Sequence, residues 1–304
     1  MNLHDVCRWL AVASCLLALG ACQNLVTSVD AKLDQASRTS LENGRRIFWA
    51  GGCASCHASA RPVSTGNATL GGGRALQTSF GVFRVPNISP EPATGIGAWS
   101  SSDFARAMKN GVAPNGRAYY PAFPYPSYAR MSDRDIGDLF AYLKTLPPVS
   151  NDVERHDLAF PANQRAALRL WQKLYLRAGP AVALPGAAPT VARGQYLVEG
   201  PGHCGACHTP RNALDGPRHA RWLGGAEMPD ETGFAPNLTS HATGLGDWSL
   251  DKIVGALRPT GQTDAAGTGM DAVRANLAHL PESDLLAIAA YLKAVPPVAP
   301  ISGR

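Results

Sequence analysis

Two short motifs carry the residues most able to do chemistry. "CASCH" occupies residues 53–57 and "CGACH" residues 204–208, so each has two cysteines, one helical turn apart, and a histidine directly after them. This spacing allows two thioether bonds and one axial imidazole, the pattern of c-type haem attachment. We therefore predict covalent anchors and axial iron ligands at these positions: anchors Cys53, Cys56, Cys204 and Cys207, ligands His57 and His208.

Two other uses of such cysteine pairs are less consistent with the sequence. Structural zinc takes four protein ligands from paired half-sites, whereas each pair here begins its own repeated unit. A redox C-x-x-C accompanies alternating strands and helices, and the sequence has no such pattern. The other three cysteines, Cys7, Cys15 and Cys22, lie near the N-terminus, which leaves no set for a disulfide framework. We expect two haem c groups as cofactors.

The chain repeats itself about 150 residues apart. Trp99 and Trp248, Tyr142 and Tyr291, and Pro148 and Pro297 are each separated by 149 positions. "SDRDIGDLFAYLKTLPPV" in one half corresponds to "PESDLLAIAAYLKAVPPV" in the other. We predict two homologous domains, residues 40–150 and 191–300, joined by a connector of residues 151–190 with one helix near 164–176 and a Pro/Ala-rich end.

The repeated unit reads as short helices joined by long Gly/Pro loops. A helix is expected before each cysteine pair, another after the loop, beginning at a serine and ending near a glycine, and a third closing the unit. In the closing helices the apolar residues recur at i, i+3, i+4 and i+7, which is typical of one buried helix face. No alternating strand pattern is evident. The predicted fold is all-α, two tandem domains, each a few helices around one covalently bound haem.

The N-terminus is typical of an export segment. Arg8 precedes an apolar run that ends near Gly20 and is too short to span a bilayer. "LGAC" at 19–22 matches a bacterial lipobox, so residues 1–21 are expected to form a lipoprotein-type signal peptide with Cys22 lipidated; an ordinary signal peptide is the alternative. This predicts a periplasmic, membrane-anchored protein. The net charge of +5 of the 304 residues is not clustered, which disfavours nucleic-acid binding.

Each half resembles a class I cytochrome c domain. The whole is similar to bacterial diheme cytochromes related to the cytochrome subunits of membrane-bound alcohol, gluconate and aldehyde dehydrogenases. "GVFRVPNISPEPATGIGAWS", "YYPAFPYPSYARMSD" and "YLVEGPGHCGACHTPRN" carry the resemblance. It implies that the first helix of each domain crosses the last, with Gly44 and Gly194 allowing close approach to the helices that bear Tyr142 and Tyr291.

The sixth iron ligand is expected to differ between the halves. In the second, Met270 lies in the loop before the last helix, where such domains place an axial methionine, while Met228 comes too early. In the first, Phe123 stands where related sequences often have methionine, and Met108 is expected in the core. This leaves Met131, which is either the ligand or a hydrophobic staple beside the helix that starts after Ser132, with an open site as the alternative.

Four further residues near the motifs have weaker assignments. Trp99 and Trp248 follow matching glycine-rich loops and resemble the indoles that donate to a haem propionate; half-buried core aromatics are the alternative. Arg211 is expected at the surface rather than over a propionate. His203, just before Cys204, is expected to be structural or exposed rather than a ligand.

No nucleophile–base pair, acid pair or phosphate loop accompanies the motifs. We therefore predict an electron carrier and not an enzyme, passing single electrons from a dehydrogenase to a cytochrome or oxidase of the respiratory chain. A diheme peroxidase or thiosulfate dehydrogenase-like oxidoreductase, with the first haem as the catalytic site, is the alternative from the enzyme class. A structural or sensing haem module is a third possibility. The sequence does not identify the donor, the acceptor or the oligomeric state.

Overall fold

The computed structural model describes residues 34–59, 69–228, 233–259, 261 and 269–299. Contacts divide the chain into one unit of residues 1–42 and another of residues 43–304. The predicted signal peptide and Cys22 lie outside the described residues. Residues 34–50 are helical, and both cysteine motifs lie in the second unit.

Four helices form the first half after the 34–50 helix. They are α2 (Cys53–His57), α3 (Ser101–Asn110), α4 (Tyr125–Tyr128) and α5 (Asp133–Leu143). α3 begins at a capping box, in which the Ser100 side chain accepts from the Asp103 amide, and it ends at Gly111 in the left-handed conformation. α5 buries the predicted face, comprising Ile136, Leu139, Phe140 and Leu143. The serine start and the glycine stop thus act as predicted.

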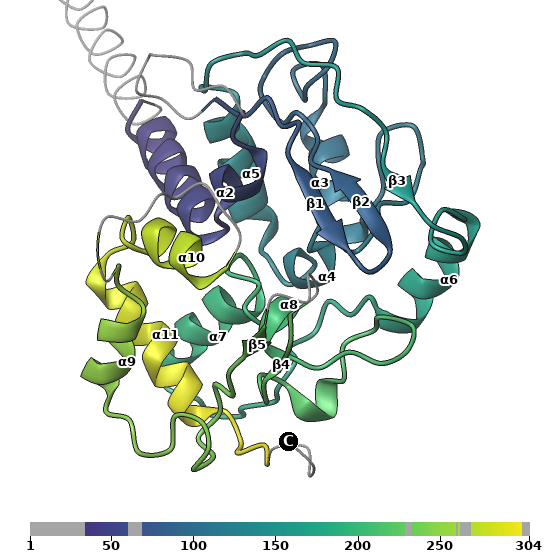
Figure 1. Ribbon diagram of the computed structural model, residues 1–304. Helices are drawn as coiled ribbons and strands as arrows, with labels where there is room; N and C mark the ends of the chain where they lie inside the picture. The colour runs from purple at the N-terminus through teal and green to yellow at the C-terminus, as the bar shows by residue number, and fades with distance from the viewer. Residues whose placement is uncertain (1–33, 60–68, 229–232, 260, 262–268, 300–304) are drawn as a thin grey trace, which may run out of the picture. The chain divides into compact units, whose positions relative to one another are not determined.

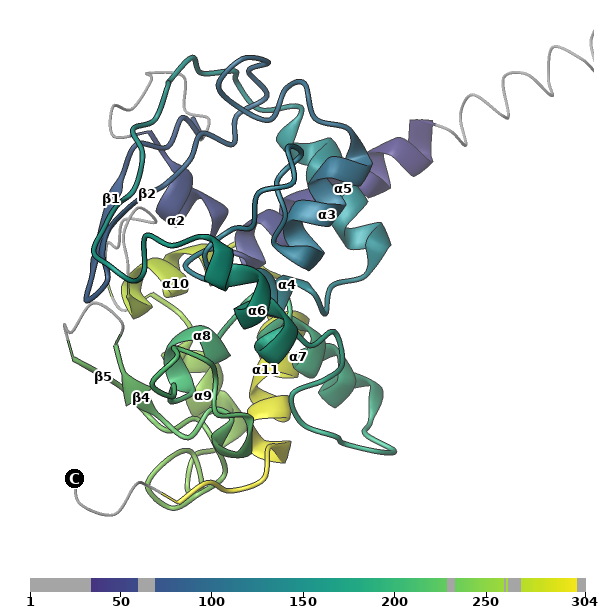
Figure 2. The same ribbon diagram turned by 90° about the vertical axis from the view of Figure 1, so that its right-hand side faces the viewer.

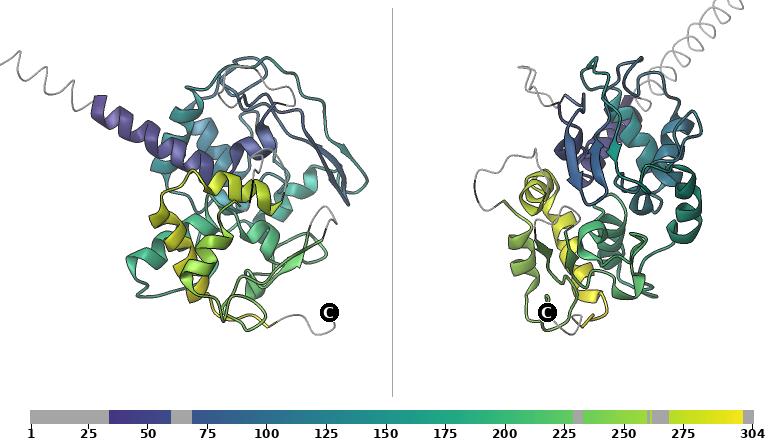
Figure 3. Two further views of the ribbon diagram at one scale, coloured as in Figure 1. Left: turned by 60° about the vertical axis from the view of Figure 1, so that its left-hand side comes forward. Right: turned by 45° about the vertical axis from the view of Figure 1, so that its right-hand side comes forward.

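The second half repeats this arrangement. It contains α7 (Pro189–Glu199), α8 (Gly205–His208), α9 (Leu250–Ala256), α10 (Met270–Leu277) and α11 (Glu282–Ala294). Ser249 caps α9 as Ser100 caps α3. α9 stops at Leu257 rather than at a glycine, so the predicted glycine stop is wrong for this helix. Figures 1, 2 and 3 show α7 lying against α11.

Glycines allow the close helix crossing that the resemblance implies. A Cβ on Gly194 would overlap the carbonyl of Ala287 in α11 and lie 2.8 Å from Cβ of Tyr291. A Cβ on Gly44 would meet the carbonyl of Asp138 in α5 and lie 2.8 Å from Cβ of Tyr142. Both crossings therefore require a residue without a side chain, and the expectation is confirmed.

The prediction of an all-helical fold is too simple. β1 (Ala75–Thr78), β2 (Gly81–Arg84) and β3 (Asp157–Leu158) form a three-stranded antiparallel sheet, with Thr78 opposite Gly81 and Gly81 opposite Leu158. β4 (Ala226–Glu227) and β5 (Phe234–Ala235) form a second, two-stranded sheet. These strands are two to four residues long, too short to show an alternating pattern in the sequence.

The connector contains one helix, α6 (Ala166–Tyr175), inside the range predicted from the sequence. A single 3-10 turn, η1 (His219–Arg221), follows the second cysteine motif. Each half has its own buried apolar cluster, one centred on Phe48, Ile136 and Leu143, the other on Leu197, Leu223 and Tyr291. No described helix is long and apolar enough to cross a membrane.

Candidate haem-binding sites

The first motif forms a short helix that presents its histidine to a fixed partner. α2 starts after Gly52, whose φ of 57° is the left-handed conformation that favours glycine. At the other end of the motif, His57 Nδ1 lies 2.8 Å from the carbonyl oxygen of Pro86. A carbonyl can only accept, so Nδ1 carries the proton and Nε2 keeps its lone pair for a metal.

The second motif reproduces this geometry. His208, the last residue of α8, places Nδ1 2.8 Å from the carbonyl oxygen of Pro236. Burial lowers the pKa of both His57 and His208, and it is the largest cause in each case. A neutral imidazole with its tautomer set by a backbone carbonyl is the form that binds iron.

The four motif cysteines have the placement that haem attachment requires. None is in a disulfide, and all four are half-buried. Burial raises the pKa of Cys53 to about 12 and that of Cys204 to about 12. These thiols therefore stay protonated near neutral pH, unlike the thiolates of thiol–disulfide exchange. The donor set, with two thiols and one imidazole in each motif, fits a haem c.

The structure places three of the methionines in or against the two apolar clusters. Met270 is the first residue of α10 rather than part of a loop, and it is half-buried against the apolar cluster of the second half. Met131 is 2% exposed and packs in the first cluster with Ile136, and Ser132 caps α5 by accepting from the Asp135 amide at 3.1 Å. Met108 is buried in the same cluster, which confirms its expected core position.

Met228 and Phe123, which stands where related sequences often have methionine, also have defined places in the structure. Met228 directly follows β4, where its amide donates to the Gly233 carbonyl. Phe123 is half-buried against the first cluster, with its ring 5.6 Å from that of Tyr128. Phe123 therefore packs against the first apolar cluster, at the position where related sequences often have methionine.

The two matching tryptophans are half-buried and pack at the edges of the two clusters. Neither indole nitrogen of Trp99 or Trp248 donates to another of the described residues. Lys252 Nζ lies 4.2 Å from the centre of the Trp248 ring. Donation by these two indoles to a haem propionate stays a prediction.

A lysine support behind each tryptophan loop was missed from the sequence alone. Lys144 Nζ donates to the carbonyls of Ile96, at 3.2 Å, and Gly97. Lys293 Nζ donates to the carbonyls of Leu245, at 3.0 Å, and Gly246, at 2.6 Å. The sequence does contain a sign of this shared role, because both lysines belong to the repeated "AYLK" and lie 149 positions apart.

The first motif and the segment just before it contact the second half at two points. His203 Nε2 lies 3.2 Å from the carbonyl oxygen of Gly51, and Asn276 Nδ2 donates to Ser55 Oγ at 2.6 Å. His203 also has a positive φ of 39° and contacts the edge of Tyr128 at 5.9 Å between ring centres. His203 is therefore structural, as expected, and joins the two halves.

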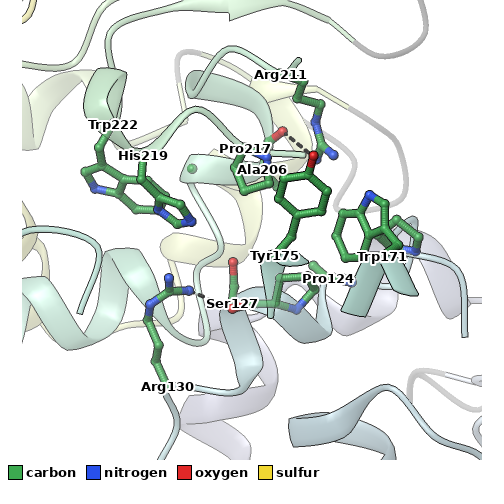
Figure 4. Close-up of a pocket in the computed structure, with 13 residues that line it drawn as sticks. Pro124, Ser127, Arg130, Trp171, Tyr175, Ala206, Arg211, Pro217, His219 and Trp222 are labelled. Atoms are coloured by element: carbon green, nitrogen blue, oxygen red, sulfur yellow. Dashed lines mark hydrogen bonds between the residues drawn. The ribbon is translucent and has the colours of Figure 1, made fainter. Parts of the chain in front are cut away.

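A pocket borders the second motif at Gly205 and Ala206 (Figure 4). On one side it is lined by Trp171 and Tyr175 of α6, and on another by Trp222. Arg211 also lines it, but its NH1 is paired with Asp215 Oδ2 at 3.0 Å and its NH2 donates to the Ala206 carbonyl. The expectation that Arg211 is fully solvated is thus wrong, since its guanidinium is held by the loop that follows the motif.

Comparison with known proteins agrees with this geometry. The family model "Cytochrome c" matches residues 41–147 and 191–296. A "Diheme cytochrome c-type" protein of Cereibacter sphaeroides is 48% identical over 258 residues, which cover 84% of this chain and 86% of that protein.

Two subunits of dehydrogenases are also similar. The gluconate 2-dehydrogenase cytochrome c subunit of Pantoea cypripedii is 38% identical over 86% of this chain, and the alcohol dehydrogenase (quinone) cytochrome c subunit of Gluconacetobacter polyoxogenes is 35% identical over 90%. The chain spans 61% and 60% of the lengths of these two subunits.

Fold and motifs together define a protein with two haem-binding modules. The chain belongs to the cytochrome c family. It carries two haem c groups and serves in electron transfer rather than as the catalytic subunit of a dehydrogenase. Two haem c groups account for both cysteine pairs, which decides against zinc and thiol exchange.

Proposed function

We propose that this protein is exported and relays single electrons from a dehydrogenase at the periplasmic face of the membrane to a cytochrome or oxidase of the respiratory chain. The observation that carries the proposal is the pair of C-x-x-C-H helices, each with its histidine Nδ1 held at 2.8 Å by a proline carbonyl. The named dehydrogenase subunits among its relatives support the class of donor.

In this proposal residues 40–150 and 191–300 are the two haem domains and residues 151–190 the connector. Cys53, Cys56, Cys204 and Cys207 would hold the haems by thioether bonds, and His57 and His208 would bind the iron. Met270 and Met131 would also bind the iron, and a thioether ligand favours ferrous iron and raises the reduction potential. Trp99 and Trp248 donate to the propionates. When bound, the haem iron supplies reversible one-electron chemistry.

The protein's own residues fix and shield these groups. The carbonyls of Pro86 and Pro236 set the histidine tautomers and the ring orientation. The lysine supports, Lys144 and Lys293, hold the tryptophan loops in place. The buried clusters exclude water from the interior of each domain, and a low-dielectric surrounding is one of the ways a protein tunes a redox centre.

Attachment to the membrane is proposed through Cys22, in the part of the chain that the structure does not describe. Replacing Cys22 by Ser should release a soluble periplasmic form or stall processing, since the lipobox cysteine receives the acyl chains. Cell fractionation and blotting measure this. An unchanged membrane fraction would show that attachment depends on another segment or on a partner.

Anaerobic reduction tests the electron-transfer assignment. The oxidised, haem-loaded protein is mixed with membranes that contain one dehydrogenase at a time, and the substrate of that dehydrogenase is then added. We expect the reduced c-type absorbance bands to appear only with substrate, and to disappear when an oxidised acceptor cytochrome follows. Failure of every dehydrogenase to reduce the protein, together with rapid peroxide turnover, would contradict the proposal.

A further inference from the structure

The connector helix α6 has one face buried against the protein and one face exposed to solvent. Leu168 and Gln172 are buried, and Gln172 Nε2 donates to the Gly111 carbonyl at 3.0 Å. Trp171 and Tyr175 point into the pocket beside the second motif (Figure 4). On the opposite face, Leu170 is 61% exposed and Leu174 is 50% exposed.

A third apolar side chain is exposed next to this face. Leu214, in the loop after the second motif, is 62% exposed, and its carbonyl accepts the indole N–H of Trp171 at 2.8 Å. Single exposed leucines are ordinary on a protein surface. Here, however, Leu170 and Leu174 are one helical turn apart and form a small apolar ridge on the outer side of α6. The backbone of Leu214 is joined to the same helix at Trp171.

The charged residues of α6 and its flanking segments are all basic, and Asp215, next to Leu214, is paired with Arg211. No Asp or Glu occurs between Asp157 and Glu199, whereas Arg165, Arg169, Lys173 and Arg177 all lie in or next to α6. Arg165 and Arg169 donate to the carbonyls of Ala118 and Gly116, at 3.0 and 2.6 Å, which leaves their charge uncompensated.

Within the part of the chain that the structure describes, none of these four cations is in an ion pair. Exposed Arg117 adds a fifth positive charge close to Arg165. The outer side of α6 is therefore an apolar ridge flanked by unpaired cations.

We propose that this face of α6 binds the surface of a bilayer rich in anionic phospholipid. Leu170, Leu174 and Leu214 would enter the boundary between headgroups and acyl chains. Arg169, Lys173 and Arg177 would lie among the phosphates. Exposed leucines bordered by cations are the pattern of helices that lie in a membrane interface. Each basic residue near an anionic surface adds about 1 kcal/mol to binding.

A lipid surface fits this face better than a protein partner does. The ten residues of α6 extend only about 15 Å. A stable protein interface needs about 800 Å² of complementary surface on each partner. A bilayer needs no matching shape, so a convex ridge with long, mobile cationic side chains is sufficient. The proposal is independent of the electron-transfer assignment and of Cys22.

Vesicle binding tests the proposal directly. The haem-loaded, exported protein with Cys22→Ser, which lacks the acyl site, is sedimented with vesicles of phosphatidylglycerol and phosphatidylcholine or of phosphatidylcholine alone. We expect binding only to the anionic vesicles, weakened at high salt. Leu170→Ser with Leu174→Ser should lower the partition coefficient about tenfold, since two leucine side chains no longer enter the interface.

A matched pair of exposed leucines provides the control. Leu250→Ser with Leu286→Ser removes leucines that are 42% and 36% exposed on α9 and α11, and it should leave binding unchanged. A nitroxide on Leu174→Cys should become more accessible to oxygen on vesicle binding, whereas one on Leu250→Cys should not.

Equal binding to anionic vesicles by the Leu170→Ser, Leu174→Ser variant and the Leu250→Ser, Leu286→Ser variant would overturn the proposal. The proposal would also be wrong if the protein did not bind anionic vesicles while α6 cross-linked to a dehydrogenase subunit in native membranes. This face would then be a protein interface.

Discussion

The two halves of the molecule hold their motif histidines in the same way, but they differ in the segment that precedes the closing helix. His57 and Pro86 correspond to His208 and Pro236, with the same 2.8 Å separation. Asn87 Nδ2 donates to the Val149 carbonyl at 2.7 Å, as Asn237 Nδ2 does to the Val298 carbonyl at 2.8 Å. The framework that holds the histidine is thus the same in both domains.

The segment before the closing helix is where the halves diverge. In the first half it is an aromatic loop with Phe123, the short helix α4 and the buried Met131. In the second it leads into α10, which begins at Met270. The two halves therefore hold the histidine alike but build the segment before the closing helix differently.

The closing tyrosines differ as well. Tyr291 is fully buried, donates to Glu199 Oε1 at 2.5 Å and accepts from Trp222 Nε1 at 3.1 Å. Its counterpart, Tyr142, is only half-buried. Glu199 also accepts from the Ala181 amide and lies 3.7 Å from Arg130 of the first half. The second half thus contains a buried polar network around Glu199, which holds the connector at Ala181.

The largest effect on stability is expected at the helix crossings. Gly44→Ala and Gly194→Ala should each lower the free energy of unfolding by about 3 kcal/mol, because the added methyl meets a backbone carbonyl that cannot move aside. Urea unfolding of the haem-loaded protein measures this.

Gly137→Ala, in α5 with no atom within 4 Å of the new Cβ, is the control and should gain about 1 kcal/mol. If both alanine variants unfold like the wild type, the claim that each crossing requires glycine is wrong; if only one of them does, the two crossings are not equivalent.

A smaller effect should separate the closing tyrosines. Tyr291→Phe is expected to cost about 2 kcal/mol, because the Glu199 carboxylate and the Trp222 indole lose a buried partner. Tyr142→Phe should change stability by less than about 0.5 kcal/mol. Thermal unfolding of the two variants measures this difference. Equal losses of stability would argue against a buried network that is confined to Tyr291.

The smallest change in stability, but a clear optical one, is expected for the sixth ligands. Met131→Leu and Met270→Leu nearly conserve volume, so each should cost less than about 1.5 kcal/mol. Each should also remove half of the methionine–ferric charge-transfer absorbance and lower the potential of one haem. An unaltered spectrum for Met131→Leu would mean that Met131 only packs beside Ile136, and would make the first haem the one to test for small ligands.

Much of this organisation is readable in the sequence because it is local or repeated. Serine starts, the apolar faces of α5 and α11 and the cysteine motifs all depend on residues a few positions apart. The proline carbonyls are not readable, since a backbone atom has no sequence signature and lies 28 or 29 residues from its histidine. The short sheets and the Glu199 network depend on tertiary contacts between distant segments.

The most direct test of two equivalent haem sites is the mass of the exported wild-type chain, followed by mapping of its proteolytic peptides. We predict the mass of the chain plus two haem groups, with one haem on the peptide containing Cys53 and Cys56 and the other on the peptide containing Cys204 and Cys207. A single haem, or cysteines recovered as disulfides or with zinc, would contradict the account.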